Sequence, residues 1–340
     1  MSDATRPRII LLVAPGTSPS VLFGLYDVLY SVGAVYADMT VGIPSPEAMQ
    51  VQIVSADGQP FRCLGDILIE PHAAIHEVDR ADAVVVCDMY TPINVAPIGN
   101  YPAVTGWLRS LHAGGALLAS VCTGSLVLAE AGLLDGRQAA AHWAYGEMFR
   151  RCYPGVTMKK GCILCLSEEA DRIVTAGGVT SWQDLAIYLV ARFCGQAQAR
   201  ETAKVHLLSG HEDGQLPFAA MNRSIEGGDA AIAECQRWIV GNFATPNPVE
   251  RMARISGLNP RTFARRFKAA TGHTPIDYVQ ALRVEEAKLL LETRRLPPDE
   301  IGGAVGYEDP ASFRRMFRRK AGLSPAAYRR KFERILRPGA

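Results

Sequence analysis

Cys122 stands where the sequence predicts a sharp turn from a strand into a helix. The apolar run 116–121 is typical of a buried strand, and residues 125–134 are typical of a helix. Ser120 and Gly124 are both small, as the close packing around a nucleophile elbow requires. The pattern therefore predicts a tight turn that lifts the Cys122 side chain out of the sheet.

A cysteine nucleophile needs its thiolate, which a neighbouring base or a strong positive field must stabilise. The helix that follows Cys122 would lower the pKa of the thiol somewhat through its N-terminus. His142, twenty residues downstream, is the candidate base, and with Trp143 it could equally form a packed, hydrogen-bonded pair in the core. Hydrolysis, a non-catalytic ligand pocket, redox sensing and plain packing all remain open for Cys122.

A second group of chemically useful residues lies in a repeat with an offset of fifty near the end of the chain. The matching positions are Asn259-Pro260 with Asp309-Pro310, Phe263 with Phe313, Phe267 with Phe317, Gly272 with Gly322, Thr274-Pro275 with Ser324-Pro325, and Tyr278 with Tyr328. Asn or Asp can cap a helix that begins with proline, and glycine can close it in a left-handed conformation. Two phenylalanines four residues apart anchor such a helix to a core.

A shorter helical segment that ends in glycine precedes each repeat unit, as VERMARISG and as PDEIGGAVG. Helix, glycine turn and second helix form the helix-turn-helix pattern of DNA-binding proteins, here present twice. With the phenylalanines inward, the residues expected to face DNA are Arg261, Thr262, Ala264, Arg265, Lys268, Ser312, Arg314, Arg315, Arg318 and Arg319. Arginine can bind phosphates or make bidentate contacts to guanine.

Alternating strand and helix signals predict the scaffold that positions Cys122. Short β-branched runs such as ADAVVVCD suit buried parallel strands, and a long helix is expected from Trp182 to about Leu208. This alternation predicts a doubly wound α/β sheet over residues 1–208, with its site at the carboxyl ends of the strands. Residues 209–228 lose all periodicity and are predicted to be a linker, and residues 229–340 are predicted to be all-α.

Charge divides the chain at the same place. Residues 229–340 hold 21 Lys and Arg against 12 Asp and Glu, a net charge of +9, whereas residues 1–228 hold 15 against 22, a net charge of −7. This asymmetry predicts an acidic domain joined to a module that binds a polyanion. The first apolar run is too short for a signal peptide or a membrane span, so a cytoplasmic protein without membrane contact is expected.

The eight cysteines are scattered through apolar segments, without the density of a secreted disulfide scaffold. Cys162 and Cys165 form a C-x-x-C pair in a strand-like stretch. No second pair accompanies them, so a zinc or redox site is not favoured. We expect neither a metal nor a cofactor.

Residues 230–335 resemble the DNA-binding domain of the AraC/XylS family of bacterial transcription regulators. The stretch GYEDPASFRRMFRRKAGLSPAAYRRKF is similar to that family's second helix-turn-helix and C-terminal signature. One departure is IGGAVG, where Gly302 and Gly303 lie in a helix that is usually richer in alanine in this family. Each glycine inside a helix costs about 1 kcal/mol of stability relative to alanine.

The first 208 residues resemble the ThiJ/PfpI-like, glutamine-amidotransferase-like domain through the stretch GGALLASVCTGSLVLAEAGLLDGRQAAAHW. The resemblance implies a flavodoxin-like fold. Hydrolytic members of that superfamily place a histidine beside the elbow cysteine and a glutamate nearby. Here Thr123 follows Cys122, and Asp27 aligns with the glutamate. The match of His142 is to the regulators' pattern rather than to the enzymes' histidine.

These observations predict a sequence-specific DNA-binding transcription regulator, not an enzyme. A small metabolite is expected in a pocket formed by Asp27, Cys122, Thr123 and His142, and a double-stranded operator is expected on the basic domain. The resemblance implies a homodimer, and RNA polymerase is a further candidate partner. The alternative is a cysteine-dependent amidase or related hydrolase with an accessory DNA-binding module, in which Cys122 would be catalytic.

Overall fold

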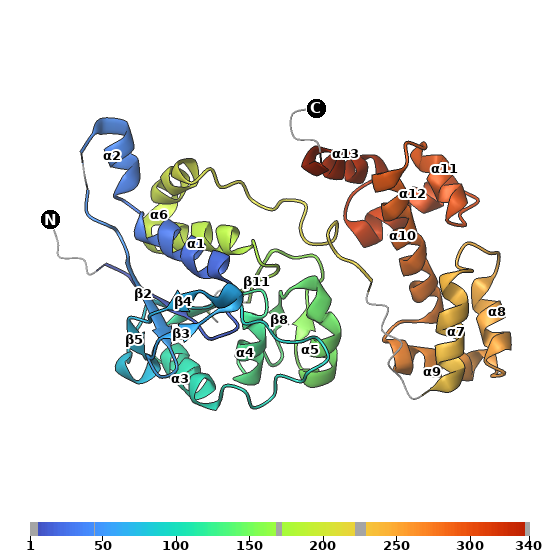
Figure 1. The fold of residues 1–340 in the computed structure, drawn as a ribbon, viewed down its shortest axis with the longest axis horizontal. Helices are drawn as coiled ribbons and strands as arrows, with labels where there is room; N and C mark the ends of the chain where they lie inside the picture. The colour runs from blue at the N-terminus through green and yellow to red at the C-terminus, as the bar shows by residue number, and fades with distance from the viewer. Residues whose placement is uncertain (1–5, 44, 168–171, 222–228, 337–340) are drawn as a thin grey trace. The chain divides into compact units, whose positions relative to one another are not determined.

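The computed structural model describes residues 6–43, 45–167, 172–221 and 229–336. The chain divides into two compact units, Met1–Gln215 and Leu216–Ala340, each with its own hydrophobic cores (Figure 1). The first unit alternates strands and helices, and the regular elements of the second are all helices. The predicted fold class, an α/β domain followed by an all-α domain, is confirmed.

A seven-stranded sheet in the order β10-β11-β7-β6-β1-β2-β5 lies at the centre of the N-terminal unit. Its strands are β1 (Arg8–Leu12), β2 (Gln50–Ser55), β5 (Ala73–Ala74), β6 (Ala83–Val86), β7 (Leu117–Val121), β10 (Leu164–Leu166) and β11 (Ile173–Ala176). The only antiparallel neighbours among them are β10 and β11. Because the strand order extends in both directions from β1, the sheet is doubly wound, as predicted.

Helices cover both faces of this sheet (Figure 1). They are α1 (Pro19–Tyr30), α2 (Val35–Val41), α3 (Pro102–Ala113), α4 (Gly124–Glu130), α5 (Gly146–Cys152) and α6 (Trp182–Val205). Alternate residues of β1 show the two layers: Ile9 and Leu11 pack with α1 and α6, whereas Ile10 and Leu12 pack with α3 and α4. Strands buried on both faces explain the continuous apolar runs in the sequence.

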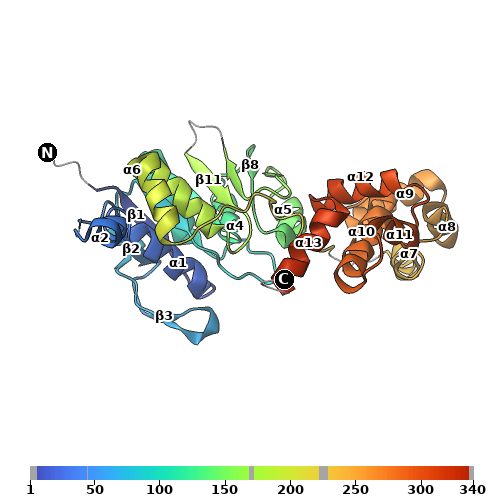
Figure 2. The ribbon, with the colours of Figure 1, turned by 90° about the horizontal axis from the view of Figure 1, so that it is seen from above.

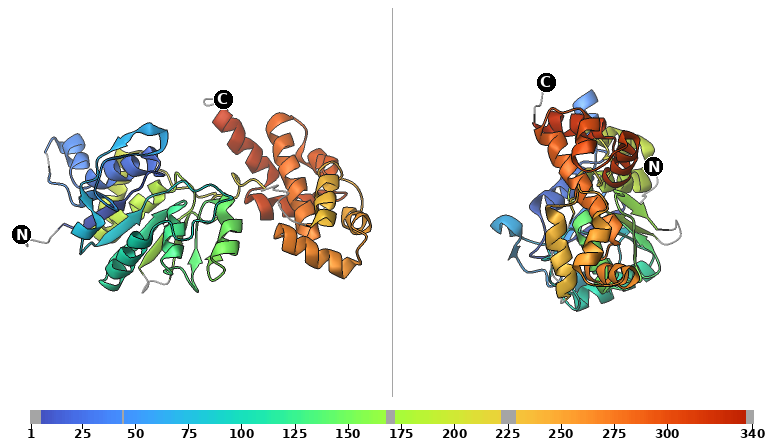
Figure 3. Two further views of the ribbon diagram at one scale, coloured as in Figure 1. Left: turned by 60° about the horizontal axis from the view of Figure 1, so that its bottom comes forward. Right: turned by 90° about the vertical axis from the view of Figure 1, so that its right-hand side faces the viewer.

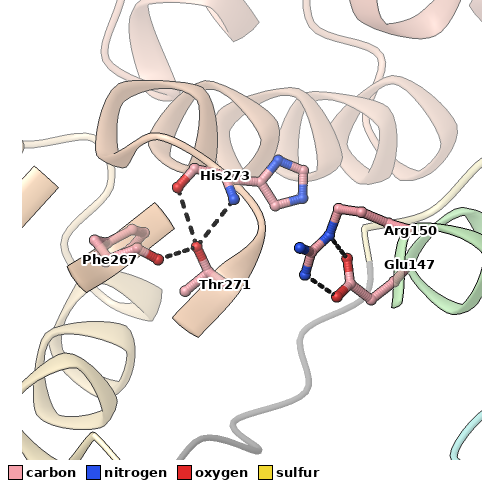
Figure 4. A network of polar contacts seen from close by, with 5 residues as sticks. All are labelled: Glu147, Arg150, Phe267, Thr271 and His273. Carbon is pink, nitrogen blue, oxygen red and sulfur yellow. Dashed lines mark hydrogen bonds and ion pairs between the residues drawn. The ribbon is translucent and has the colours of Figure 1, made fainter. Parts of the chain in front are cut away.

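Two short additions complete the unit. The first is a hairpin of β3 (Phe61–Arg62) and β4 (Leu68–Ile69), which extends away from the layers (Figure 2). The second pairs β8 (Gln138–Ala139) with β9 (Thr157–Met158). On α5, which follows this strand β8, Glu147 and Arg150 form an ion pair one turn apart (Figure 4).

The long helix predicted from Trp182 to about Leu208 is present as α6, with one break in its regular geometry. Gly195 inside α6 has φ +88° and ψ 165°, which is not helical, so α6 is bent there. The helix then ends at Val205. The apolar spacing that predicted the helix comes entirely from the part before Gly195, where Leu185 and Leu189 are fully buried.

Helices make up the regular structure of the second unit over its described residues (Figure 3). They are α7 (Ala230–Val240), α8 (Pro248–Ile255), α9 (Pro260–Thr271), α10 (Pro275–Thr293), α11 (Pro298–Ala304), α12 (Pro310–Ala321) and α13 (Pro325–Leu336). Residues of α7 to α9 pack on the first half of α10, and residues of α11 to α13 pack on its second half. Helix α10 is therefore the common support of two small cores.

The segment that the sequence predicts as a linker, residues 209–228, is divided between the two units. Residues 209–215 belong to the N-terminal unit and residues 216–221 to the helical unit, whereas residues 222–228 lie outside the described part of the chain. Residues 209–221 contact the unit to which they belong through a few backbone and side-chain hydrogen bonds and one aromatic contact. Contacts of this kind leave no periodic pattern, so they could not be predicted from the sequence.

The two glycines of α11 have different surroundings. A Cβ atom added to the buried Gly302 would lie 2.8 Å from Cδ1 of Phe313, which is fully buried, whereas a Cβ on the exposed Gly303 would meet nothing within 4 Å. The departure at Gly302 therefore accommodates the Phe313 ring at close range. Only Gly303 is a cost in helix propensity without a packing reason.

Replacing these glycines separately should shift stability in opposite directions. Gly303→Ala should raise the free energy of unfolding by about 1 kcal/mol, because it removes the entropic cost of glycine in a helix. Gly302→Ala should lower the free energy of unfolding, because its methyl group overlaps a ring that is already packed. Urea unfolding of both variants measures this, and equal stabilisation by the two would contradict the packing argument.

Candidate functional site

The structure contains the predicted elbow at Cys122, which lies between β7 and α4 with φ +54°. Its N–H donates to the Ala176 carbonyl at 2.8 Å, and the Ser125 hydroxyl donates to the Cys122 carbonyl at 2.8 Å. A Cβ on Gly124 would lie 2.4 Å from the Val86 carbonyl oxygen, so glycine is required there. A non-glycine residue in this conformation is strained, and such strain is commonly found at functional sites.

The thiol of Cys122 is nevertheless poorly suited to act as a nucleophile. Burial, and after it the charge of Asp88, raises its pKa to about 12, and hydrogen bonds from Thr123 offset only part of this. The residue is 4% exposed. At neutral pH the sulfur therefore holds its proton, whereas catalytic cysteines need a lowered pKa.

Asp88 is the acidic residue of the elbow, and it was not among the residues predicted to lie there. It lies two residues after the end of β6 and is 4% exposed, and its carboxylate accepts hydrogen bonds from the Ser18 backbone N–H at 3.1 Å and from the Ser18 hydroxyl. Burial raises the pKa of Asp88, and the bonds from Ser18 oppose that shift. The available signal was an aspartate directly after an apolar strand, at the edge where the carboxyl ends of parallel strands meet.

Asp27, expected in the pocket, is exposed on α1 and is not among the groups that shift the pKa of Cys122. Its charge acts instead on His206, whose pKa it raises against a larger lowering by burial. Thr123 does lie at the elbow, where its hydroxyl oxygen accepts the Met89 N–H at 3.0 Å. The acidic residue at the elbow is thus Asp88.

His142 precedes a short 3-10 turn, Trp143–Tyr145, and its Nδ1 accepts the Ala144 N–H at 3.2 Å. Its ring lies 5.0 Å from that of Trp143, and burial lowers its pKa, so the imidazole is neutral at neutral pH. Within this turn, Tyr145 is the residue that interacts with Cys122 of the elbow. Burial raises the pKa of Tyr145 most, and Cys122 is among the neighbouring groups that raise it further.

Two cavities that border the sheet bear on where a ligand could bind. One, lined by Met89, Thr91, Tyr101 and Thr123 among others, has a volume of about 10 Å³, enough for a single water molecule. The other has about 540 Å³ and is lined by residues that include Leu117, Ile173, Tyr188 and the arginines 172 and 192. It lies where β7 and β11 begin, at the opposite sheet edge from Cys122. No sequence pattern predicted this cavity.

Two helix-turn-helix motifs, α8–α9 and α11–α12, occur in the second unit as predicted. Asn259 accepts the Thr262 N–H at 3.0 Å to cap α9, and Asp309 accepts the Ser312 N–H at 2.9 Å to cap α12. Gly272 and Gly322 close the two helices with φ +73° and +77°. Figure 4 shows the last turn of α9, where the Thr271 hydroxyl contacts the Phe267 carbonyl at 2.8 Å.

The burial of the two recognition helices repeats residue by residue. Phe263, Phe267, Phe313 and Phe317 are at most 1% exposed. Of the predicted DNA-facing residues, the exposed ones are Arg261, Ala264, Arg265, Lys268, Arg314, Arg315, Arg318 and Arg319, and the half-buried ones are Thr262 and Ser312. Each helix therefore presents a basic face to solvent while its phenylalanines hold it to the core.

The basic side chains of the two helices differ in their contacts. Within the described part of the chain, Arg261, Arg265 and Lys268 of α9 form no hydrogen bond or ion pair through their side chains. On α12, Arg314 pairs with Asp299 at 2.5 Å, Arg315 donates to the Ser312 hydroxyl at 2.8 Å, and Arg319 donates to Gln280 at 3.1 Å. These pairs are exposed and weak, so DNA can replace them.

Among the described residues, no group of three His, Cys, Asp or Glu side chains could hold a metal ion. In the same ranges, no single helix has the length and apolar character needed to cross a membrane. The pair α1 and α2, bent by 58°, meets that test by length and composition only.

Comparisons with known proteins cover both units. Residues 7–192 match the DJ-1/PfpI family, and residues 252–331 match a helix-turn-helix domain. The HTH-type transcriptional regulator CdhR of Pseudomonas aeruginosa is 28% identical over 81% of this chain and 80% of its own. The isonitrile hydratase of Pseudomonas putida is 28% identical over 55% of this chain and 72% of its own.

Among solved structures, DJ-1beta of Drosophila melanogaster matches with a TM-score of 0.50 at 20% identity, over 61% of this chain and all of its own. This likeness concerns the fold of the N-terminal unit. The family match covers more than half of the chain, and the helix-turn-helix match covers all of the second motif described above and the first motif from residue 252 onward. The chain therefore belongs to the DJ-1/PfpI family and carries an AraC-type helix-turn-helix domain at its C-terminal end.

Proposed function

We propose that the protein is a sequence-specific DNA-binding transcription regulator. The observation that carries the proposal is the repeated helix-turn-helix, in which two capped recognition helices expose equivalent rows of arginine and lysine. A basic helix face held by a buried aromatic anchor is what entry into the major groove requires. The HTH-type regulators among the relatives support the same assignment over most of the chain.

The N-terminal unit is proposed to sense a small metabolite at the elbow. Cys122, Asp88, Thr123 and Tyr145 gather there, whereas the described residues that line the larger cavity at the opposite sheet edge include no cysteine. Since the space beside Thr123 holds about one water, a metabolite has to displace neighbouring side chains. We further propose a cytoplasmic homodimer that contacts RNA polymerase at its promoters.

Selection of duplexes from a random-sequence pool by the full-length chain tests this function. We expect enrichment of sequences with two conserved segments, and a dissociation constant for the selected duplex at least about 10³-fold below that for a scrambled duplex. Equal affinity for the two duplexes would contradict the proposal.

A cysteine-dependent hydrolase is the second candidate function, favoured by the intact elbow and by the isonitrile hydratase among the relatives. The raised pKa of Cys122 argues against it. We expect no turnover of amides, aldehydes or isonitriles by the wild-type protein, and DNA binding by Cys122→Ser equal to that of wild type. Turnover that disappears in Cys122→Ser would establish the hydrolase instead.

A further inference from the structure

The residues that lead out of the N-terminal unit, His211–Gln215, are bound to it by specific polar contacts. The Gln215 amide donates to the carbonyl oxygens of Cys162 at 2.8 Å and Ala141 at 3.1 Å, and its carbonyl oxygen accepts the Trp143 N–H at 3.1 Å. The backbone N–H of Gln215 donates to Gly161 at 3.0 Å. We refer to His211–Gln215 as the strap.

The surroundings of the strap are shaped to this glutamine. Gln215 is 5% exposed, and a Cβ on Gly177 would lie 2.0 Å from its Nε2, so only glycine leaves room for the amide. At the other end of the strap, His211 contacts Asp184 of α6 twice, from its N–H at 3.1 Å and from Nδ1 at 2.5 Å. A buried amide with its donors and acceptor satisfied has one favourable position, and leaving it is costly.

The strap also touches the turn that reaches the elbow. Trp143, which donates to Gln215, begins the 3-10 turn that ends at Tyr145. The Tyr145 hydroxyl donates to the Thr91 carbonyl at 2.6 Å, on the loop that follows Asp88. Cys122 is among the neighbouring groups that raise the pKa of the same phenol, after burial. One short turn therefore connects the elbow with the side chain of Gln215.

Only a few residues after the strap, at Phe218 and Ala219, the chain contacts the helical unit. The Phe218 ring lies 5.7 Å from that of Phe332, and the ammonium of Lys331 lies 5.1 Å from the Phe218 ring centroid. The buried Lys288 donates to the Ala219 carbonyl at 2.5 Å. Only Leu216 and Pro217 separate the residues bound to the two units, and proline restricts that step further.

We propose that the strap couples the elbow to the DNA-binding unit: movement of the Trp143–Tyr145 turn releases Gln215 and frees the two-residue connection. The proposal rests on the proposed function, because it assigns the route by which a ligand at Cys122 changes DNA binding. It names Gln215 as the positioning residue between the two units.

Hydrogen exchange on the full-length chain tests the coupling without a ligand. Tyr145→Phe, which removes the bond to Thr91, should speed exchange of the Gln215 N–H at least threefold. Gln215→Ala should speed exchange of the Trp143 N–H about five- to tenfold, as expected for one lost hydrogen bond. Gln196→Ala, an exposed glutamine on α6, is the matched control and should change neither. Exchange at Leu11 and Val85 in the sheet should stay unchanged, which excludes global destabilisation.

Binding to the selected duplex supplies the second arm. Gln215→Ala should change the dissociation constant at least threefold, and adding Tyr145→Phe to it should have no further effect, because the route is already broken. An unchanged exchange rate of the Gln215 N–H in Tyr145→Phe would contradict the proposed coupling. Wild-type affinity for the selected duplex in Gln215→Ala would contradict it as well. Failure of the wild-type chain to discriminate duplexes would instead reject the proposed function, and the exchange rates would still decide the coupling.

Discussion

Inserting five base pairs between the two conserved segments of the selected duplex should abolish specific binding. The two recognition helices are supported by the same helix, α10, whose nineteen residues span about 28 Å at 1.5 Å per residue. That length suits two neighbouring major-groove segments on one face, about 34 Å apart along B-form DNA. Five base pairs rotate one segment by about half a turn, so only one recognition helix can stay in its groove.

The rigid support also predicts the result of a longer insertion. An insertion of ten base pairs returns the two segments to the same face of the DNA but moves them about 34 Å further apart. Helix α10 cannot span that added distance. Affinity for both duplexes should therefore fall to the level of a scrambled duplex. Gel-shift titration measures this, and tolerance of ten but not five inserted base pairs would show that α10 acts as a flexible tether.

Removing one arginine from each recognition helix should weaken specific binding strongly. Arg265→Ala and Arg315→Ala each remove an exposed guanidinium from the middle of a basic face. A lost base contact costs about 1–3 kcal/mol and relaxes the preference at one position of the site. The double variant should lose about 2–6 kcal/mol if the two contacts act independently.

Arg254→Ala is the matched control, because it removes an exposed guanidinium from α8 rather than from a recognition helix. Its specific affinity should fall less than that of either test variant. Titrations with selected and scrambled duplexes separate the two roles of arginine. Equal, small losses on both duplexes would mean that Arg265 and Arg315 contact only phosphate.

The regular parts of this protein could be predicted from the sequence because each depends on local chemistry. The repeat was visible since caps, phenylalanine anchors and closing glycines recur at fixed offsets, as Asn259 and Asp309 illustrate. The elbow was visible because a strand, a cysteine and small neighbours follow one another directly. The elbow, and each unit of the repeat, can be recognised from about twenty consecutive residues.

What the sequence missed depends on contacts between distant segments. Asp88 acts on Cys122 only because β6 and β7 are adjacent in the sheet, an order that the sequence does not display. Asp27 was expected at the elbow from an alignment with a relative's glutamate, yet its helix presents it to solvent. Gln215 was assigned to a linker, because a single buried amide in an irregular segment has no periodicity.

The most direct test of the central claim is the salt dependence of binding by the full-length chain to selected and scrambled duplexes. The account predicts tight binding to the selected duplex, at least about 10³-fold weaker binding to the scrambled one, and a slope of log K against log salt near −0.9 for each phosphate contacted. Several phosphate contacts from two recognition helices should make that slope steep. Equal affinity for the two duplexes at every salt concentration would contradict the claim that this protein reads DNA sequence.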